Sequence, residues 1–528
     1  MKRNSIPVVD LFAGPGGLGE GFSALNDGKS FHIVVSAEKD PVAHLTLRLR
    51  AFYRLLRSER PELLSDYYSY CHGEATEPYS EASEDLWIKA GEEALCIELG
   101  TEDGNAELDT AITSALGGAP NSPWVLIGGP PCQAYSLVGR ARNKGKADYK
   151  AEGDNRHFLY KEYLRIIQRY RPALFVMENV KGLLSAKVND SLIFHEILRD
   201  LACPERAIEG VCDGVRYKIF SMVSDQSFSA EDDPAKLDAN SFIIKAEDYG
   251  IPQARHRVIL VGVREDMVSG HMPNLEKQAE VSVEDAIDEL PKLRSRLSKQ
   301  PDSPELWANN VGTLLSELAD SAVDYSMQDI AAGLRQAAGS LKERFAHGAN
   351  IYPKKYDVGT GSEQLDAWLI DKNLDVWLNH ESRSHRIDDL GRYAYAAVFA
   401  DQRKKSPKGH AEFLLPGLAP AHKNWESGKF SDRFRVQTRN GPSTTITSHI
   451  SKDGHYFIHY DPAQCRSLTV REAARLQTFP DNYFFQGPRT DQFHQVGNAV
   501  PPYLANQIAN IVFEYILDEL CAQKNNTI

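Results

Sequence analysis

The sequence predicts an α/β protein built on a doubly wound, Rossmann-like sheet, with a second, smaller domain. Short apolar runs of strand length alternate with helix-like segments over the first half of the chain, a pattern typical of βα units. After about residue 270 the alternation stops, and irregular sequence rich in His, Arg, Trp, Gly and Pro indicates a different domain. A length of 528 residues also exceeds one ordinary core.

The composition is that of a globular protein, with 42% hydrophobic and 25% charged residues. No apolar stretch is long enough to span a bilayer and the N-terminus lacks an apolar signal core, so no membrane contact is expected. Seven scattered cysteines do not suggest a disulfide framework, and the spacing of Cys203 and Cys212 does not suggest zinc. We therefore expect free thiols, no metal and a cytoplasmic location.

The net charge of −13 is distributed unevenly. Residues 51–120 hold 15 acidic and four basic side chains, whereas residues 131–175 hold ten basic and four acidic ones, and residues 380–440 hold twelve and seven. Because local patches govern attraction to phosphate, the overall charge does not exclude a nucleic-acid partner. On charge alone, ordinary solvated surfaces explain these basic clusters as well as a nucleic-acid-binding patch does.

The first predicted strand, residues 6–12, runs into a glycine-rich turn at residues 13–22. Such a turn between a strand and a helix lets a cofactor approach the backbone. A second strand, residues 32–37, ends at Glu38, where an acidic side chain is placed to accept hydrogen bonds from a ribose. We favour a nucleoside cofactor without a pyrophosphate over a dinucleotide at this turn. Residues 45–120 are helix-like and acidic, and we interpret them as an inserted subdomain or a long crossover.

A strand over residues 124–127 leads into the sequence Gly128-Gly129-Pro130-Pro131-Cys132. Prolines fix φ and glycines permit close backbone approach, so the loop holds one thiol stiffly at a strand end, where ligands bind in open α/β sheets. The alternative is a buried and inert cysteine, which is the commoner kind.

Two further strands, over residues 172–177 and 258–263, carry charged side chains at their ends. The first delivers Glu178, and the second follows Arg255 and Arg257. Each charge alone has an ordinary explanation, such as a helix cap or a surface residue. Their occurrence at successive strand ends, together with the cysteine loop and the glycine turn, predicts one composite site.

The second half of the chain reads as helices over residues 284–345 and irregular, strand-like sequence over residues 350–465. An amphipathic helix is predicted over residues 469–476. A turn at residues 495–502 then precedes a final apolar helix at residues 503–517.

Six short motifs occur in order between residues 10 and 502. They are Asp10-Leu11-Phe12-Ala13-Gly14-Pro15-Gly16-Gly17, Gly129-Pro130-Pro131-Cys132-Gln133, Glu178-Asn179-Val180, Gln253-Ala254-Arg255-His256-Arg257, Arg471-Glu472-Ala473-Ala474-Arg475-Leu476-Gln477-Thr478-Phe479-Pro480 and Gly497-Asn498-Ala499-Val500-Pro501. With these motifs the sequence resembles the DNA (cytosine-5)-methyltransferase family of the bacterial restriction-modification type. The resemblance covers nearly the whole chain.

The resemblance implies three parts of the chain. Residues 1–268 would form a catalytic domain that binds S-adenosylmethionine and carries the acidic insertion at about residues 45–120. Residues 269–480 would form a target-recognition domain, and residues 481–528 would return to the catalytic domain.

The resemblance also implies S-adenosylmethionine as the methyl donor and no metal. The donor site would be lined by Phe12, Gly14, Pro15, Gly17, Leu18, Glu38, Pro130, Leu159, Asn498 and Ala499. Glu38 would hold the ribose hydroxyls and Leu159 would contact the adenine. The acid that the family carries after its third strand is not identifiable within the acidic segment, where Glu98 is a guess.

The implied chemistry is covalent catalysis. C5 of cytosine is too weak a nucleophile to take a sulfonium methyl group unaided, and addition of the Cys132 thiolate to C6 makes C5 enamine-like. Glu178 would bind or protonate N3, while Arg255 and Arg257 would hold O2 of the base and phosphate oxygens. The base must first be flipped out of the duplex, with residues 139–150 as a candidate closing loop.

Sequence recognition is expected within residues 270–480, through contacts in the major groove. The candidate phosphate or base contacts are His380, Arg383, His385, Arg386, Arg403, Lys404, Lys405, Arg433, Arg435 and Arg439.

The expected partners are double-stranded DNA and a cognate restriction endonuclease, and the expected state is a monomer, cytoplasmic and associated with the nucleoid when bound to DNA. A tRNA cytosine-5 methylase of the same fold is the main alternative, disfavoured by the large basic region after residue 270. A catalytically dead DNA-binding regulator would not need Cys132, Glu178 and both arginines together. An amino-group methyltransferase is disfavoured because a thiol follows Pro131.

Overall fold

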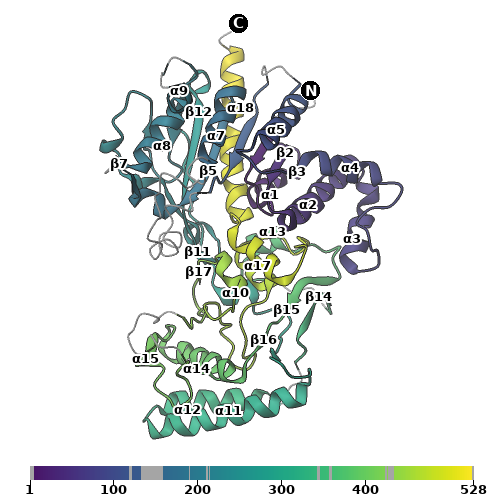
Figure 1. Cartoon of the computed structure of the whole chain (residues 1–528), viewed down its shortest axis with the longest axis vertical. Coiled ribbons are helices and arrows are strands. Elements are labelled where there is room, and N and C mark those ends of the chain that lie inside the picture. Colours follow the sequence, from purple (N-terminus) through teal and green to yellow (C-terminus); the bar gives the residue numbers. More distant parts are fainter. Residues whose placement is uncertain are drawn as a thin grey trace.

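The computed structural model describes residues 5–117, 122–131, 159–188, 191–209, 212, 214–341, 345–355, 359–421, 425 and 433–525. Its centre is a mixed sheet (Figure 1). The strands of this sheet are β1 (Ile6–Leu11), β2 (Phe31–Glu38), β3 (Ala94–Cys96), β4 (Val125–Gly128), β5 (Leu174–Val180), β8 (Tyr217–Phe220), β9 (Ser227–Phe228), β10 (Ile243–Lys245) and β12 (His256–Arg264).

The strand order is β3-β2-β1-β4-β5-β12-β8-β9, with β10 paired to β12. Strands β3, β2, β1, β4 and β5 are parallel, whereas β12 is antiparallel to both of its neighbours. The order reverses at β1, so the carboxyl ends of β1 and β4 lie where an open α/β sheet binds ligands.

Helices cover both faces of the sheet. Alternate residues along each strand face opposite sides. The side chains of Val8 and Val125 pack with α1 (Gly17–Ala24) and α18 (Pro502–Asn525), and those of Val9 and Leu126 pack on the other side. The second layer contains α5 (Glu102–Ala115), α7 (Leu159–Tyr170) and α8 (Ile193–Ala202). The predicted doubly wound α/β sheet is confirmed.

The acidic segment after β2 is a long crossover. It contains α2 (Pro41–Glu59), α3 (Leu64–His72) and α4 (Glu84–Glu93) before the chain returns to the sheet as β3. The sequence pattern did not locate β3 within this helix-like segment, because a three-residue edge strand is too short to show alternation. The helices of the crossover pack against Leu374 and Leu378 from the second half of the chain.

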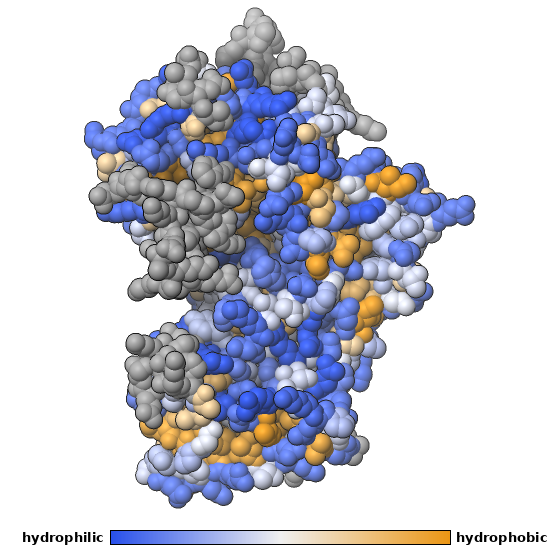
Figure 2. Space-filling view, viewed as in Figure 1, coloured by the Kyte–Doolittle hydropathy of each residue, from blue (hydrophilic) through white to orange (hydrophobic). Residues whose placement is uncertain are grey.

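Beyond the sheet, the chain between β12 and α18 forms a second region with its own buried core. At its far end lie three packed helices (Figure 1), and Figure 2 shows apolar residues gathered at this end of the molecule. The helices of this region are α10 (Val283–Ile287), α11 (Pro304–Asp324), α12 (Gln328–Ser340), α13 (Glu363–Leu369), α14 (Ile387–Arg403), α15 (Gly409–Glu412), α16 (Val470–Leu476) and α17 (Arg489–Asn498). Its strands are β13 (Arg296–Leu297), β14 (Gly348–Pro353), β15 (Val376–Glu381), β16 (Ser384–His385) and β17 (Ser443–Thr444), the last paired to β11 (Gln253–Ala254).

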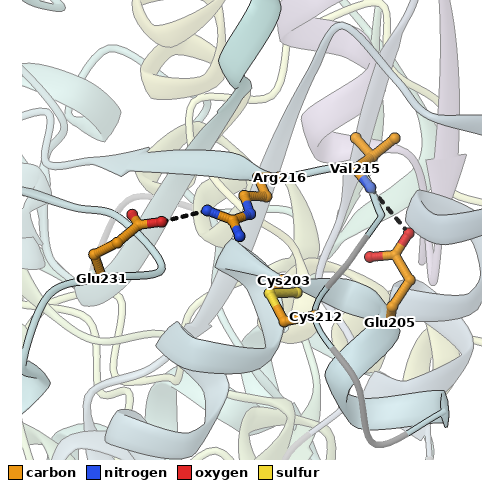
Figure 3. Close-up of a disulfide and its surroundings, with 6 residues drawn as sticks. All are labelled: Cys203, Glu205, Cys212, Val215, Arg216 and Glu231. Carbon is orange, nitrogen blue, oxygen red and sulfur yellow. Dashed lines mark hydrogen bonds and ion pairs between the residues drawn. A yellow bond between two sulfur atoms is a disulfide. The ribbon is translucent and has the colours of Figure 1, made fainter.

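Cys203 and Cys212 form a disulfide (Figure 3). The expectation of free thiols is therefore wrong for this pair. The short helix α9 (Pro204–Glu209) turns the chain back so that the two Cα atoms lie 5.8 Å apart, which cysteine spacing alone does not reveal. None of the described helices combines the length and the apolar character that a bilayer crossing requires.

Helix α16 is buried on every side, so the predicted amphipathic pattern is wrong there. Its charged side chains are paired inside the protein. The guanidinium of Arg475 donates two hydrogen bonds to Asp481, at 2.9 and 2.7 Å, and the carboxylate of Glu472 accepts two from Arg466, at 2.7 and 2.6 Å. Ion pairing makes burial of these charges possible, and it fixes α16 to the segment that follows it.

We expect Arg475→Met to lower the free energy of unfolding by about 3–5 kcal/mol, because Asp481 stays buried without its bidentate partner. Arg386→Met is the matched control, since Arg386 pairs with Asp388 at an exposed position and such pairs contribute about 0–1 kcal/mol. Urea unfolding of both variants measures the difference. Similar losses in the two variants would contradict the structural role of the α16 ion pairs.

Candidate active site

The glycine loop connects β1 to α1. Gly14 and Gly16 adopt φ values of 58° and 97°, which side chains rarely tolerate, so the chain turns sharply over the end of the sheet. A methyl group placed on Gly14 would meet no atom of the described residues within 4 Å, so this part of the chain leaves open space above the loop. The loop thus combines a tight turn with an exposed backbone.

Glu38 at the end of β2 holds this loop. One carboxylate oxygen accepts a hydrogen bond from the Gly14 amide at 2.8 Å, and the other accepts one from the Asp40 amide at 2.8 Å. A carboxylate has about four acceptor positions, so Glu38 retains capacity for a ligand. The structure therefore places Glu38 beside the glycine turn, as its sequence position suggested.

Asp10, near the end of β1, is a buried carboxyl group that sequence reasoning passed over. Its side chain is 1% exposed, and neither oxygen has a hydrogen-bond partner among the described residues. Burial raises the pKa of Asp10 to about 8, and the Arg54 guanidinium and the Gly19 amide offset this only in part. Asp10 is therefore a buried carboxyl group with a raised pKa next to the glycine loop, which makes it a candidate functional residue.

The C-terminal segment closes the loop from the other side. A side chain on Gly17 would overlap the Val500 carbonyl oxygen, and a methyl there would lie 3.3 Å from Ala499 Cβ. Asn498, which ends α17, is exposed, and its amide nitrogen lies 3.2 Å from His494 Nδ1. Residues from opposite ends of the chain thus meet at one turn.

The residues predicted to line the donor site occupy different positions relative to the glycine loop. Leu18 is packed in the core beneath the sheet, so its side chain does not line the loop's open side. Leu159 begins α7, and its Cδ2 would lie 3.6 Å from a methyl group on Gly100. Glu98, the guess for the acid after the third strand, follows β3 and pairs with Lys39 at 3.3 Å. Phe12 has a φ of 57° and packs at the edge of the core.

The loop that leads to Cys132 starts from the middle of the sheet. Gly128 lies against β1, where any side chain would overlap the Leu11 carbonyl oxygen. A methyl group on Gly129 would lie 3.1 Å from a carboxylate oxygen of Glu178. Pro130 is buried and Pro131 is the last described residue before Cys132. Cys132 and the candidate loop at residues 139–150 lie outside the described residues.

Glu178 and Arg257 form an ion pair between neighbouring strands. Arg257 Nε lies 2.7 Å from Glu178 Oε1, and both side chains are largely buried. The antiparallel register of β5 and β12, which pairs Arg257 with Val180, brings the two charges together. A carboxylate held in this way has a fixed orientation beside the Gly129 backbone.

Asn179 and Gln253 are functional candidates that the sequence reasoning missed. The Asn179 side-chain amide donates to the Pro130 carbonyl oxygen at 3.2 Å and so fixes the proline loop. The Gln253 side chain donates to the Leu476 carbonyl oxygen and to Gln477 Oε1, at 3.2 and 3.0 Å. Both residues belong to the six sequence motifs, but only the tertiary structure shows that their side chains donate hydrogen bonds to distant backbone carbonyl groups.

Arg255 lies close to Arg257 but points into the protein. Its side chain is 2% exposed, and Nη1 donates to the Ile446 carbonyl oxygen at 2.9 Å and to that of Gly497 at 3.5 Å. Burial and the Arg257 cation lower the pKa of Arg255, and Glu178 opposes the change. In this structure Arg255 joins β12 to the segment beside α17.

Several expected DNA contacts of the second region are buried. His380, Arg383 and His385 lie in the interior, which is a correction to their assignment as base or phosphate contacts. Burial lowers the pKa of His380 to about 4 and of Arg383 to about 10. Arg403, Lys405 and Arg439 are nearer the surface but pair with Asp329, Glu412 and Glu284, respectively. Tertiary packing, which sequence charge counts do not include, accounts for the difference.

Comparison with known proteins decides the family. The family model for C-5 cytosine-specific DNA methylases matches residues 110–202 and 238–514. The chain belongs to this family. This methylase is 33% identical over 524 residues to the type II methyltransferase M.Bpa9945I of Bacillus paralicheniformis, covering 96% of this chain and 99% of the relative.

A more distant relative of this methylase is the type II methyltransferase M.AgeI of Thalassovita gelatinovora, 26% identical over 76% of this chain and 85% of the relative. In fold, the methylase resembles a prophage-encoded E. coli protein whose name assigns it as a DNA modification methyltransferase. That likeness has a TM-score of 0.53 at 19% identity and covers 97% of this chain and 99% of the other. The family resemblance identified from the six motifs is confirmed.

We expect Asp10→Asn to become progressively more stable than the wild type as the pH rises from 4 to 8. The folded protein keeps the Asp10 proton up to about pH 8, whereas the ordinary value is 3.8, so the wild type loses stability over this window. The difference should reach about 2–5 kcal/mol at pH 8, because each pKa unit contributes about 1.4 kcal/mol.

Urea unfolding at several pH values measures this difference. Asp225→Asn, at an exposed position, is the control and should show no such trend. A stability difference for Asp10→Asn that does not change with pH would contradict the assignment of a buried, protonated carboxyl.

Proposed function

We propose that this methylase transfers a methyl group from S-adenosylmethionine to C5 of a cytosine flipped out of a specific duplex DNA sequence. The arrangement of Glu178, Arg257 and Gly129, which stands three residues before Cys132 in the sequence, carries the proposal. It supplies a fixed carboxylate beside the backbone that leads directly into the proposed nucleophile.

The residues at the glycine loop fit a cationic nucleoside such as S-adenosylmethionine. Among the described residues, open space lies above Gly14, and Glu38 has acceptor capacity for a ribose. The donor site would be completed by Phe12, Pro15, Gly17, Pro130, Leu159, Asn498 and Ala499, and by the backbone of Leu18, whose side chain packs in the core. When bound, S-adenosylmethionine supplies an electrophilic methyl group on its sulfonium.

The chain's own residues would carry the steps on the base. The Cys132 thiolate forms a bond to C6 of the cytosine, which raises the electron density at C5. Glu178, oriented by Arg257, shares a proton with N3 and stabilises the charge that develops on the ring. After C5 has gained the methyl group, loss of the C5 proton and cleavage of the bond between Cys132 and C6 release 5-methylcytosine.

Arg255 would act by positioning rather than by touching the base. Its bonds to the carbonyl oxygens of Ile446 and Gly497 tie β12 to the second region and to the end of α17. Arg257, two residues further on and near the start of β12, would provide the contact to the base or its phosphate.

We further propose that residues 269–480 read the DNA sequence, and that the protein acts as a monomer in the cytoplasm, with a restriction endonuclease of the same specificity as its partner. The type II names of its relatives support the restriction-modification role. A methylation assay with duplex DNA beside tRNA distinguishes the main alternative. Transfer to tRNA alone would contradict a DNA substrate.

We expect Cys132→Ser to abolish DNA methylation while S-adenosylmethionine binding is retained, because serine lacks the nucleophilic thiolate that adds to C6. Bisulfite sequencing of DNA from cells that express the variant measures methylation, and the same measurement on the wild type gives the target sequence. Near-normal methylation by the variant would refute the covalent mechanism.

We expect Glu178→Gln to lower kcat by about 10²-fold or more, because the amide cannot share a proton with N3. Glu247→Gln is a matched control, since Glu247 also pairs with a β12 side chain, His256, at 2.7 Å, but lies outside the proposed site. Steady-state methylation of duplex DNA measures both variants. Equal losses would mean that Glu178 acts only through the ion pair's contribution to folding.

A further inference from the structure

Helix α2 of the acidic crossover packs one buried face against the glycine loop and against the segment after α16. The side chains of Thr46, Leu47, Arg50 and Tyr53 occur at spacings that place them on the same side of a helix. All four are buried. This face therefore has a packing partner, whereas the acidic residues of the crossover lie mainly at the surface.

Arg50 joins α2 to α1. Its guanidinium donates to both carboxylate oxygens of Glu20, at 2.8 and 2.6 Å, and the two side chains are at most 5% exposed. Its remaining terminal nitrogen donates to Asn482 Oδ1 at 2.9 Å. One buried cation thus links the helix that follows the glycine loop to the segment that follows α16.

Tyr483, next to Asn482, reaches the glycine loop itself. Its hydroxyl donates a hydrogen bond to the Pro15 carbonyl oxygen, between the two left-handed glycines. A methyl group on Gly16 would lie 3.0 Å from this hydroxyl and 2.9 Å from Leu47 Cδ1, so both side chains wall the turn. The Arg50 guanidinium lies 4.8 Å from the centre of the Tyr483 ring.

We propose that Tyr483, supported by Arg50 and the buried face of α2, is a positioning residue that sets the path of the glycine loop for S-adenosylmethionine. The left-handed turns at Gly14 and Gly16 are intrinsically permissive, because glycine has many accessible conformations. A hydrogen bond to the carbonyl between them selects one path in advance of binding, which reduces the ordering cost when a ligand arrives. The crossover thereby gains a role in donor binding.

The inference rests on the proposed function, since S-adenosylmethionine is its ligand. Tyr483→Phe removes only the hydroxyl. Tyr217→Phe is the matched control, because the Tyr217 hydroxyl also donates to a proline carbonyl, that of Pro172, at 2.9 Å, and both residues are buried. Pro172 precedes β5 and so lies at the opposite end of that strand from Glu178.

Calorimetric titration with S-adenosylmethionine, without DNA, measures the dissociation constant of each variant. We expect Tyr483→Phe to raise it about 3- to 10-fold, the loss that one hydrogen bond produces, and Tyr217→Phe to change it less than about 2-fold. With saturating donor, kcat on duplex DNA should stay within about 2-fold of the wild type for both variants, because the chemical step does not use Tyr483.

An unchanged dissociation constant for Tyr483→Phe, or an equal rise for Tyr217→Phe, would overturn the assignment. A fall in kcat with an unchanged dissociation constant would overturn it as well. Because the binding measurement contains no DNA, it tests the loop assignment independently of whether methyl transfer takes place.

Discussion

The close approach of the two ends of the chain is the constraint on which the rest of the structure depends. Gly17 and Gly21 lack side chains where the backbone around Val500 and Pro502, and the side chain of Ala505, pack onto α1. Any larger residue at either glycine would separate α1 from α18. The entire second region must therefore leave the sheet after β12 and return within van der Waals distance of its first helix.

Buried charged side chains also hold in place the part of the chain that returns to the sheet. The segment from α16 to α17 carries Arg471, whose guanidinium donates to three backbone carbonyl oxygens, and the paired Arg475 and Asp481. Gln253 and Arg255, which precede β12, donate to carbonyl oxygens of the same segment, those of Leu476 and Gly497, respectively. Many polar side chains of the six sequence motifs therefore hold buried backbone in place. The side chains proposed to act on the substrates lie at only a few strand ends.

Local sequence patterns were sufficient to predict much of the fold and part of the candidate active site. Apolar runs such as residues 124–127 and 258–263 identify strands because both of their faces are covered, and Glu38 follows from its spacing after the glycines. The short β3, the all-round burial of α16 and the interior positions of His380 and His385 depend on contacts with distant residues. The pairing of Arg257 with Glu178 likewise follows from strand register, which no local pattern encodes. The role of Cys132 stays a prediction, since it lies outside the described residues.

The return of α18 to α1 has a consequence for protein synthesis. At about 5–20 residues per second, the segment around Val500 leaves the ribosome roughly 25–100 s after the glycine loop. During that interval the apolar side chains of Phe22 and Leu18 lack the helix that covers them in the finished protein. The nascent chain therefore carries an uncovered face of its sheet and an unfinished donor site, so DNA modification can begin only when translation has passed the last motif.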